Sequence, residues 1–344
     1  MNLNGVPTLR YVVAPTTKEI YDSDKASYDV LDEIPTLDTL SNENDAVDGF
    51  ESLYGYVLQR RQYLPIDSVT GNEGFISFIK TTVKVLLVSI KNFFKWIWSF
   101  FGSKEKTTEV KSRTIGENLI KHGVNTGEIP YPKTTAFIYP TKTKPVNNLN
   151  WLSASLTNMV KGVDKAQLYI DKLNKFVTPT ISPGKEFHEL LSGKIDAYQK
   201  EVNGLFGNSG KPVNFLSVND IRLSSGRLTY EMNGQSTHLI KGATFQTTDT
   251  QVKTLYAEYS VFKSKLSVLT KSITGLERGM VKTVEFGLEL VNAAGKEPAK
   301  SKEALSKLRN TINTSMGNIK VLETALYRGS SSVLAIINNC VKKG

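Results

Sequence analysis

The chain has 344 residues, of which 43 are lysine or arginine and 33 are aspartate or glutamate, so its formal net charge at pH 7 is +10. A single cysteine excludes a disulfide-stapled scaffold, and three histidines leave little scope for a zinc site. The length is sufficient for two domains with a buried core.

The charge is divided unevenly along the chain. Residues 1–73 hold 13 acidic and 5 basic side chains, a net charge of −8, whereas residues 74–344 hold 20 acidic and 38 basic side chains, a net charge of +18. Apolar residues in the first segment keep neither a helical nor a strand period for long. The sequence therefore predicts an acidic, largely irregular segment joined to a basic body.

Residues 75–101 are strongly apolar and aromatic, with four lysines and no acidic residue. On a helix the lysines fall on one side, and aliphatic and aromatic side chains surround the rest. The charges make the stretch a poor transmembrane span. It fits either an amphipathic helix at a membrane surface or on a partner, or a core helix whose lysines reach solvent. The residues of this candidate interface are Lys80, Lys84, Lys91, Lys95, Phe93, Phe94, Trp96, Trp98 and Phe101.

Gly102 is expected to end this helix, which makes residues 74–102 one segment. Residues 103–150 are then predicted to form a linker, because closely spaced prolines disfavour helix. The prolines are Pro130, Pro132, Pro140 and Pro145.

The remaining body, residues 151–344, is predicted to be mainly helical. Apolar residues recur at helical spacing over 151–177 and 183–205. Near residues 212–246 the period changes to two, and Asn233-Gly234 suits a hairpin turn. A small β insertion is therefore expected there.

The last hundred residues carry two heptad patterns, over residues 252–280 and 305–340, separated by a break that contains Pro298. Helices with such apolar seams are expected to pack as an antiparallel hairpin, which other helices or another subunit would complete. The predicted fold class is thus mainly α, a helical bundle with a long C-terminal antiparallel hairpin and a small β-hairpin insertion.

Motifs for catalysis are weak. Residues 204–212 superficially resemble a phosphate-binding loop, but Pro212 stands where a magnesium-binding serine or threonine is required. Cys340 occupies a heptad position, as a buried thiol would. The histidines belong to different predicted elements; they are His122, His188 and His238. No catalytic, cofactor or metal site is predicted, and the chain is expected not to be an enzyme.

The layout resembles that of internal head proteins of large tailed bacteriophages, of the T4-like and jumbo myovirus kind. Such proteins carry an acidic propeptide, which a prohead protease removes after a small residue, any residue and glutamate, or after a Leu/Ile-x-Glu site. At the charge switch, Gly71, Asn72 and Glu73 fit the first pattern, with Gly74 as the next residue. A second candidate is Ser41, Asn42 and Glu43. Further matches are Leu31-Asp32-Glu33, Gly295-Lys296-Glu297 and Ser301-Lys302-Glu303.

The resemblance implies a non-enzymatic virion protein of the capsid interior, present in the host cytoplasm during assembly and cleaved during maturation. Its implied partners are capsid or scaffold proteins, the prohead protease and, non-specifically, double-stranded DNA. The propeptide-like segment 1–73 would keep the basic body off DNA until cleavage. Two alternatives stay open: a peripheral membrane-active or pore-forming effector that uses residues 75–101, and a helical scaffold or tail assembly protein that oligomerises through its heptad helices.

Overall fold

The structure is a computed structural model that describes residues 72–140, 144–178, 187–206, 212–213, 221–230, 240–288 and 298–342. The chain divides into two units, Met1–Ser68 and Val69–Gly344, and every described residue belongs to the second. The segment 1–73, predicted to be irregular, therefore lies outside the described residues except for its last two.

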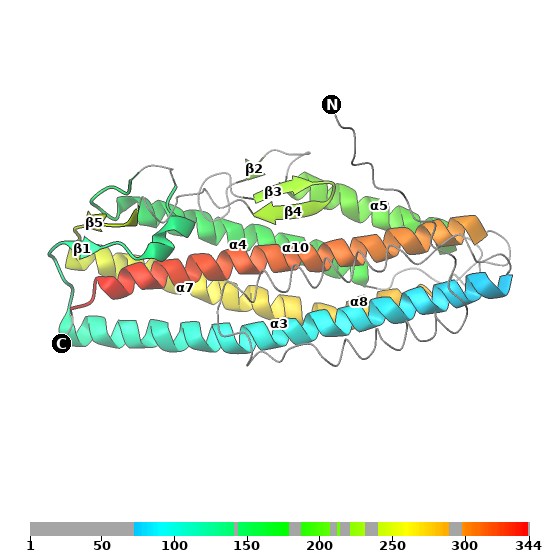
Figure 1. The fold of residues 1–344 in the computed structure, drawn as a ribbon, viewed down its shortest axis with the longest axis horizontal. Helices are drawn as coiled ribbons and strands as arrows, with labels where there is room; N and C mark the ends of the chain where they lie inside the picture. The colour runs from blue at the N-terminus through cyan, green and yellow to red at the C-terminus, as the bar shows by residue number, and fades with distance from the viewer. Residues whose placement is uncertain are drawn as a thin grey trace, which may run out of the picture. The chain divides into compact units, whose positions relative to one another are not determined.

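The described unit is a helical bundle with two small antiparallel sheets (Figure 1), which confirms the predicted mainly-α fold. Its α-helices are α3 (Asn72–His122), α4 (Asn150–Val177), α5 (Phe187–Phe206), α7 (Asp249–Thr274), α8 (Leu276–Phe286) and α10 (Pro298–Asn339). The shorter elements are the 3-10 helix η3 (Lys133–Phe137) and the strands β1 (Ile129–Pro130), β2 (Pro212–Val213), β3 (Ile221–Ser224), β4 (Arg227–Tyr230) and β5 (Thr244–Phe245).

Helices α4 and α7–α8 run in the same direction. Asp164 pairs with Lys265 near the middle of α4, and the carbonyl of Val177, at its end, accepts a hydrogen bond from Thr283 in α8. Helix α4 is therefore parallel to α7 and α8, and α8 continues the course of α7 after Gly275 (Figure 1).

Helix α10 runs against α7, as the heptad patterns predicted. The Tyr259 hydroxyl lies 2.9 Å from Ser330 Oγ, whereas Thr270, later in α7, contacts Tyr327, earlier in α10, at 3.4 Å. The predicted antiparallel hairpin is therefore present. Its core is completed by helices of the same chain, because α10 also contacts α3, α4, α5 and strand β4.

The residues predicted at the heptad positions are buried throughout. In α10 the polar gap in the pattern, Ser315, is buried as well, and its hydroxyl lies 3.0 Å from that of Tyr198 in α5. The buried seam residues are Val252, Leu255, Tyr259, Phe262, Leu266, Leu269, Ile273, Leu276 and Met280 in α7–α8, and Leu305, Leu308, Ile312, Ile319, Leu322, Leu326, Val333, Ile336 and Cys340 in or just after α10.

The prediction that the first helix ends at Gly102 was wrong, because α3 continues without a break to His122. Beyond the glycine its buried residues recur every three or four positions, at Thr108, Ser112, Ile115 and Leu119. Packing of this stripe outweighs the local preference for a helix end, since one glycine inside a helix costs only about 1 kcal/mol relative to alanine.

The predicted linker over residues 103–150 is therefore half helix, and its second half packs on the body. Tyr131 and Ile138 are buried there. The Tyr131 hydroxyl lies 2.8 and 2.9 Å from the carbonyl oxygens of Val146 and Asn148, which share its one proton, and it accepts a hydrogen bond from the Trp151 indole at 3.1 Å. These contacts hold the proline-rich chain against the start of α4.

The β insertion contains the sheet β2-β3-β4. Its hairpin turns at Ser225 and Gly226, whose φ angles of +49° and +78° suit a two-residue type I′ turn. The predicted turn at Asn233-Gly234 lies outside the described residues. Phe245, also expected in the insertion, instead pairs with Ile129 in the separate sheet β1-β5.

Candidate functional surface

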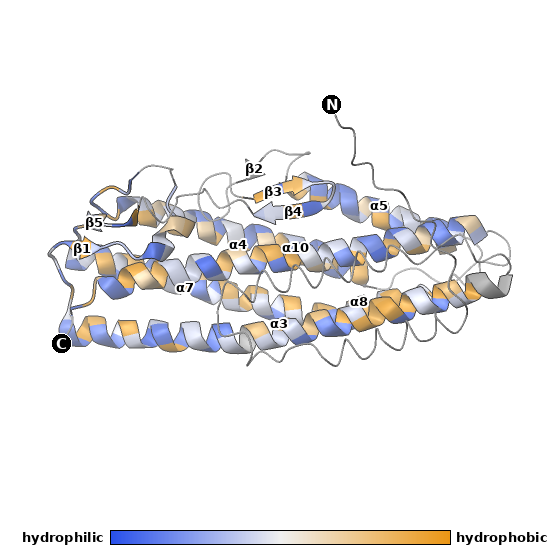
Figure 2. Cartoon of the chain, viewed as in Figure 1, coloured by the Kyte–Doolittle hydropathy of each residue, from blue (hydrophilic) through white to orange (hydrophobic). Residues whose placement is uncertain are grey.

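The first half of α3 is richer in hydrophobic residues than its second half (Figure 2), and its apolar side is buried in the core of the bundle. Phe93 and Phe94, which the sequence placed on a candidate interface, are buried there. The same side of the helix also buries Ile79, Val83, Leu86, Ile90 and Ile97. Of the two interpretations of residues 75–101, the core helix whose lysines reach solvent describes this arrangement.

The aromatic residues that follow are divided between core and surface. Trp96 is half-buried, with its ring stacked on Phe100 at a centroid distance of 5.1 Å and Lys320 Nζ 4.9 Å from its centroid. Trp98 is 58% exposed, which makes it the one large exposed aromatic residue among those described. The side chain of Phe101 lies outside the described residues.

The exposed side of this half of α3 carries Lys80, Lys84, Lys91, Lys95 and Trp98, which we call the lysine face. No acidic residue occurs between residues 74 and 104 to balance these charges locally. Three of the lysines, Lys80, Lys91 and Lys95, form no ion pair with any residue that the structure describes.

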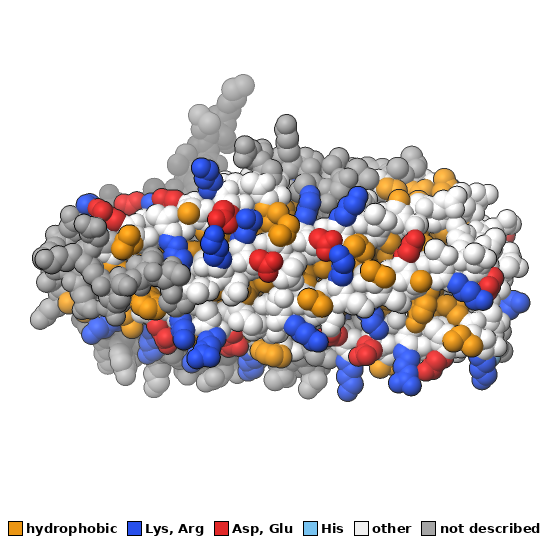
Figure 3. All heavy atoms as spheres, turned by 180° about the vertical axis from the view of Figure 1, so that it is seen from behind, with side chains coloured by type: hydrophobic (Ala, Val, Ile, Leu, Met, Phe, Trp, Pro, Cys, Tyr) orange, Lys and Arg blue, Asp and Glu red, His pale blue; other side chains and the backbone are white. Residues whose placement is uncertain are grey.

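Some charges elsewhere on the described surface are balanced by ion pairs. Lys172, Lys253 and Lys265 each pair with a carboxylate, at 3.1, 2.7 and 2.6 Å respectively. From the side opposite to that of Figure 1, lysine and arginine side chains are interspersed with aspartate and glutamate (Figure 3). The lysine face differs in that none of the residues on α3 between Gly74 and Lys104 is acidic.

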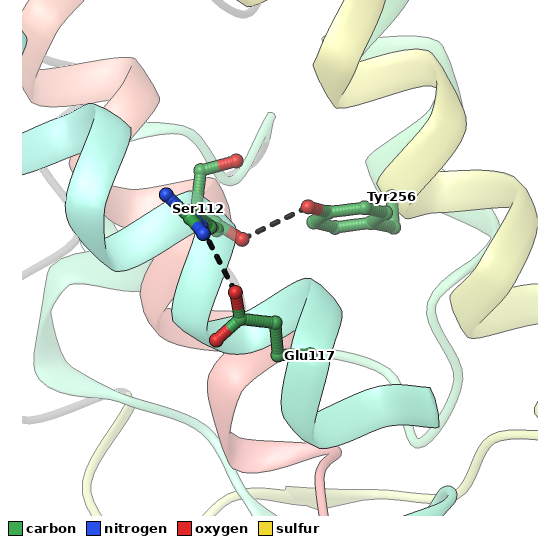
Figure 4. A network of polar contacts seen from close by, with 4 residues as sticks. Ser112, Glu117 and Tyr256 are labelled. Atoms are coloured by element: carbon green, nitrogen blue, oxygen red, sulfur yellow. Dashed lines mark hydrogen bonds and ion pairs between the residues drawn. The ribbon is translucent and has the colours of Figure 1, made fainter. Parts of the chain in front are cut away.

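The second half of α3 is fixed to α7 by a close polar contact (Figure 4). The Tyr256 hydroxyl donates to the carbonyl of Ser112 at 2.9 Å, and Gly116 leaves room for the tyrosine ring. On the exposed side, Arg113 pairs with Glu117 at 2.9 Å. The contact between Tyr256 and Ser112 ties the second half of α3 to α7.

The candidate processing sites differ in their surroundings. Asn72, Glu73 and Gly74 lie in the first turn of α3, whereas Gly71 and the second candidate, Ser41-Asn42-Glu43, lie outside the described residues. The match at residues 301–303 lies inside α10, where Ser301 is fully buried. The matches at residues 31–33 and 295–297 are outside the described residues.

One ionisable group in the core was not predicted from the sequence. Glu323 in α10 is buried, and neither of its carboxylate oxygens has a hydrogen-bond partner among the described residues. Burial raises the pKa of Glu323 well above its usual range, because a buried site favours the neutral form of a carboxyl group. Burial also raises the pKa of the neighbouring Tyr327.

The remaining chemically distinctive residues are dispersed. Burial raises the pKa of the Cys340 thiol to about 12, which leaves it protonated and unreactive. His188 is buried in α5, His122 lies at the end of α3, and His238 is outside the described residues. Within the described ranges, no group of three or more histidine, cysteine, aspartate or glutamate residues could hold a metal ion. None of the described helices has the length and apolar character needed to cross a membrane.

Comparisons of this chain with protein-family models, with curated proteins and with solved structures gave no match.

Proposed function

We propose that the protein is a non-enzymatic structural protein of a bacteriophage capsid interior, matured by proteolysis and associated with packaged double-stranded DNA. The observation that carries this proposal is the charge switch at Glu73, from −8 before it to +18 after it. A candidate processing tripeptide ends at the same residue.

The position of Glu73 in the chain supports cleavage there. It lies in the first turn of α3, close to the division between the two units at Ser68 and Val69. The terminal turn of a helix opens at low cost, which gives a protease access to the bond between Glu73 and Gly74. Ser301-Lys302-Glu303 fits the same pattern, but Ser301 is buried in α10, so a protease would have to draw this turn out of the bundle to cleave there.

Cleavage would act on DNA association through charge alone. Removal of residues 1–73 changes the formal net charge from +10 to +18. Polyanions bind cationic surfaces through the release of condensed counterions, without reading the base sequence. The uncut chain would therefore associate weakly with DNA during assembly, and the mature body would associate more strongly with the packaged genome.

The membrane-active alternative has less support. It requires the apolar side of residues 75–101 to face lipid, yet that side is buried among the other helices. Freeing it would expose at least seven large apolar side chains, at about 1.5–3 kcal/mol each. We therefore favour a role in which α3 stays in the bundle.

The test is the mass and N-terminal sequence of the protein in purified particles. We expect the chain to be found inside the capsid, with Gly74 as its first residue. Particles in which Met1 is retained would contradict the proposed maturation. Absence of the chain from particles would contradict the proposed location.

A further inference from the structure

We propose that the lysine face of α3 is the surface along which the phosphate backbone of duplex DNA lies. This inference rests on the proposed DNA association and specifies where on the body it occurs. Lys80, Lys91 and Lys95 would contact phosphates, and Trp98 would lie beside them at the end of the contact.

The length of the lysine face suits a run of phosphates. Lys80 and Lys95 belong to one uninterrupted helix and are separated by about 22 Å at the usual rise per residue. Duplex DNA carries a phosphate about every 3.4 Å along each strand, so about six phosphates of one strand fit within that length. Three lysines can therefore each contact a different phosphate.

The electrostatics of the face favour a polyanion. Lys80, Lys91 and Lys95 are exposed and have no carboxylate partner among the described residues. Binding of a phosphate would not have to displace an existing ion pair, as it would at Lys253 or Lys265. Binding instead releases the counterions condensed on the DNA, and this release is the main source of non-specific affinity for DNA.

The chemistry of the face favours DNA over a lipid surface. Between Lys80 and Lys95 the exposed residues other than lysine are polar, namely Thr81 and Asn92. An interfacial helix inserts an apolar side into the acyl region, but in α3 that side is buried in the core. Trp98 alone is too small an apolar surface for insertion, whereas its indole N–H can donate to a phosphate oxygen.

The experiment compares two triple variants of the full chain with the same net charge. The first carries Lys80→Gln, Lys91→Gln and Lys95→Gln on the lysine face. The control carries Lys161→Gln, Lys200→Gln and Lys241→Gln, which remove three exposed lysines from other parts of the body. Affinity for a random-sequence 30-base-pair duplex is measured between 50 and 200 mM salt, and circular dichroism verifies that each variant is folded.

We expect the lysine-face variant to lose about 2.7 units of the slope of log affinity against log salt, because each lost phosphate contact removes about 0.9. Between 50 and 200 mM salt, the factor by which affinity falls should therefore be about 40 times smaller for the lysine-face variant than for the unaltered chain. The control should keep most of its salt dependence. Equal losses in the two variants would overturn the proposed surface and leave the proposed DNA association intact. If residues 1–73 keep the unaltered chain from binding at 50 mM salt, the same two triple variants are compared in the body 74–344, and failure of the unaltered body to bind the duplex would overturn both proposals.

A second readout uses Trp98 and includes vesicles as a competing ligand. The duplex should shield tryptophan from acrylamide quenching in the unaltered chain and have little effect in Trp98→Phe. The same measurement is made with vesicles of phosphatidylserine and phosphatidylcholine. Shielding by vesicles but not by the duplex would assign the lysine face to a membrane surface and overturn the proposal.

Discussion

Glu323 is a carboxyl group in the core of the bundle, without a hydrogen-bond partner among the described residues. Burial raises its pKa, so the folded protein holds the proton that an unfolded chain releases above a pKa of about 4.3. Unfolding at a pH between these two pKa values therefore releases a proton. It follows that the free energy of unfolding falls as the pH rises from about 4.3 towards the pKa of the folded state, by at most about 1.4 kcal/mol per pH unit from this group.

Replacement of this carboxyl by an apolar side chain of similar size should remove that pH dependence. We expect Glu323→Met to be more stable than the unaltered chain at pH 8, with an advantage that shrinks towards pH 5. Urea unfolding at several pH values measures the difference. Glu303→Met, which removes an exposed carboxylate of the same helix, is the control for the loss of a carboxyl group outside the core. Parallel pH profiles of Glu323→Met and the unaltered chain would contradict the assignment of a neutral acid.

Asn318 ties the β hairpin to the central helix. Its Oδ1 accepts a hydrogen bond from the Leu228 amide at 2.8 Å, and its Nδ2 donates to the Gly226 carbonyl at 2.9 Å. Asn318→Leu should lower the free energy of unfolding by about 2–4 kcal/mol, because two backbone groups lose their partners. Urea unfolding measures this loss, and faster hydrogen exchange at Leu228 would localise it. Asn310→Leu, at an exposed position of α10, should change stability by only about 0.5 kcal/mol, and an equal effect of the two would argue against the tie.

At the scale of the helix, the space beside a glycine determines whether replacing it by alanine raises or lowers the free energy of unfolding. At Gly317 in α10 an added Cβ would meet no atom within 4 Å, whereas at Gly279 in α8 it would lie 2.7 Å from Val177 Cγ2 in α4. Gly317→Ala should therefore gain about 1 kcal/mol from helix propensity. Gly279→Ala should instead lose about 1–3 kcal/mol to crowding. Thermal unfolding of both variants tests the α4–α8 packing, and stabilisation by both would contradict so close an approach.

The regular elements could be predicted where the apolar period was long. Leu305 and Ile312 belong to a seven-residue pattern that only a buried helix explains, and both are buried. The end of α3 could not be read in this way, because Gly102 and the charged residues after it suggest a break. The stripe through Thr108 and Ser112 is polar, so its burial depends on α7 and α10, which are distant in sequence.

The candidate interface could be predicted only in part, because its burial also depends on helices that are distant in sequence. The pattern placed Trp96 and Trp98 together, but only the surrounding helices decide that Trp96 packs on Phe100 while Trp98 stays exposed. Glu323 shows the same limit. Its charge suggests an exposed position, and its burial follows from the central place of α10, whose neighbours surround it on several sides.

At the scale of the whole molecule, the residues that build the core and the residues that lower the net charge lie in different parts of the sequence. All the described core residues lie between Ile79 and Cys340, so the body 74–344 retains them after cleavage at Glu73. The lysines remain on its surface, and the eight-charge difference between the chain and the body belongs to residues 1–73. Folding of the body and control of its charge can therefore be tested apart.

We expect the body 74–344 to unfold cooperatively and to bind duplex DNA up to a higher salt concentration than the full chain, because its net charge is +18 rather than +10. A matched full-length variant tests whether charge is the cause. Replacing the eight aspartates of residues 1–73 by asparagine also gives +18; they are Asp22, Asp24, Asp29, Asp32, Asp38, Asp45, Asp48 and Asp67. If charge suffices, the variant and the body should release DNA at similar salt concentrations. A variant that behaves like the unaltered chain would show instead that residues 1–73 oppose DNA binding through their bulk, and that removal of the segment is required rather than its neutralisation.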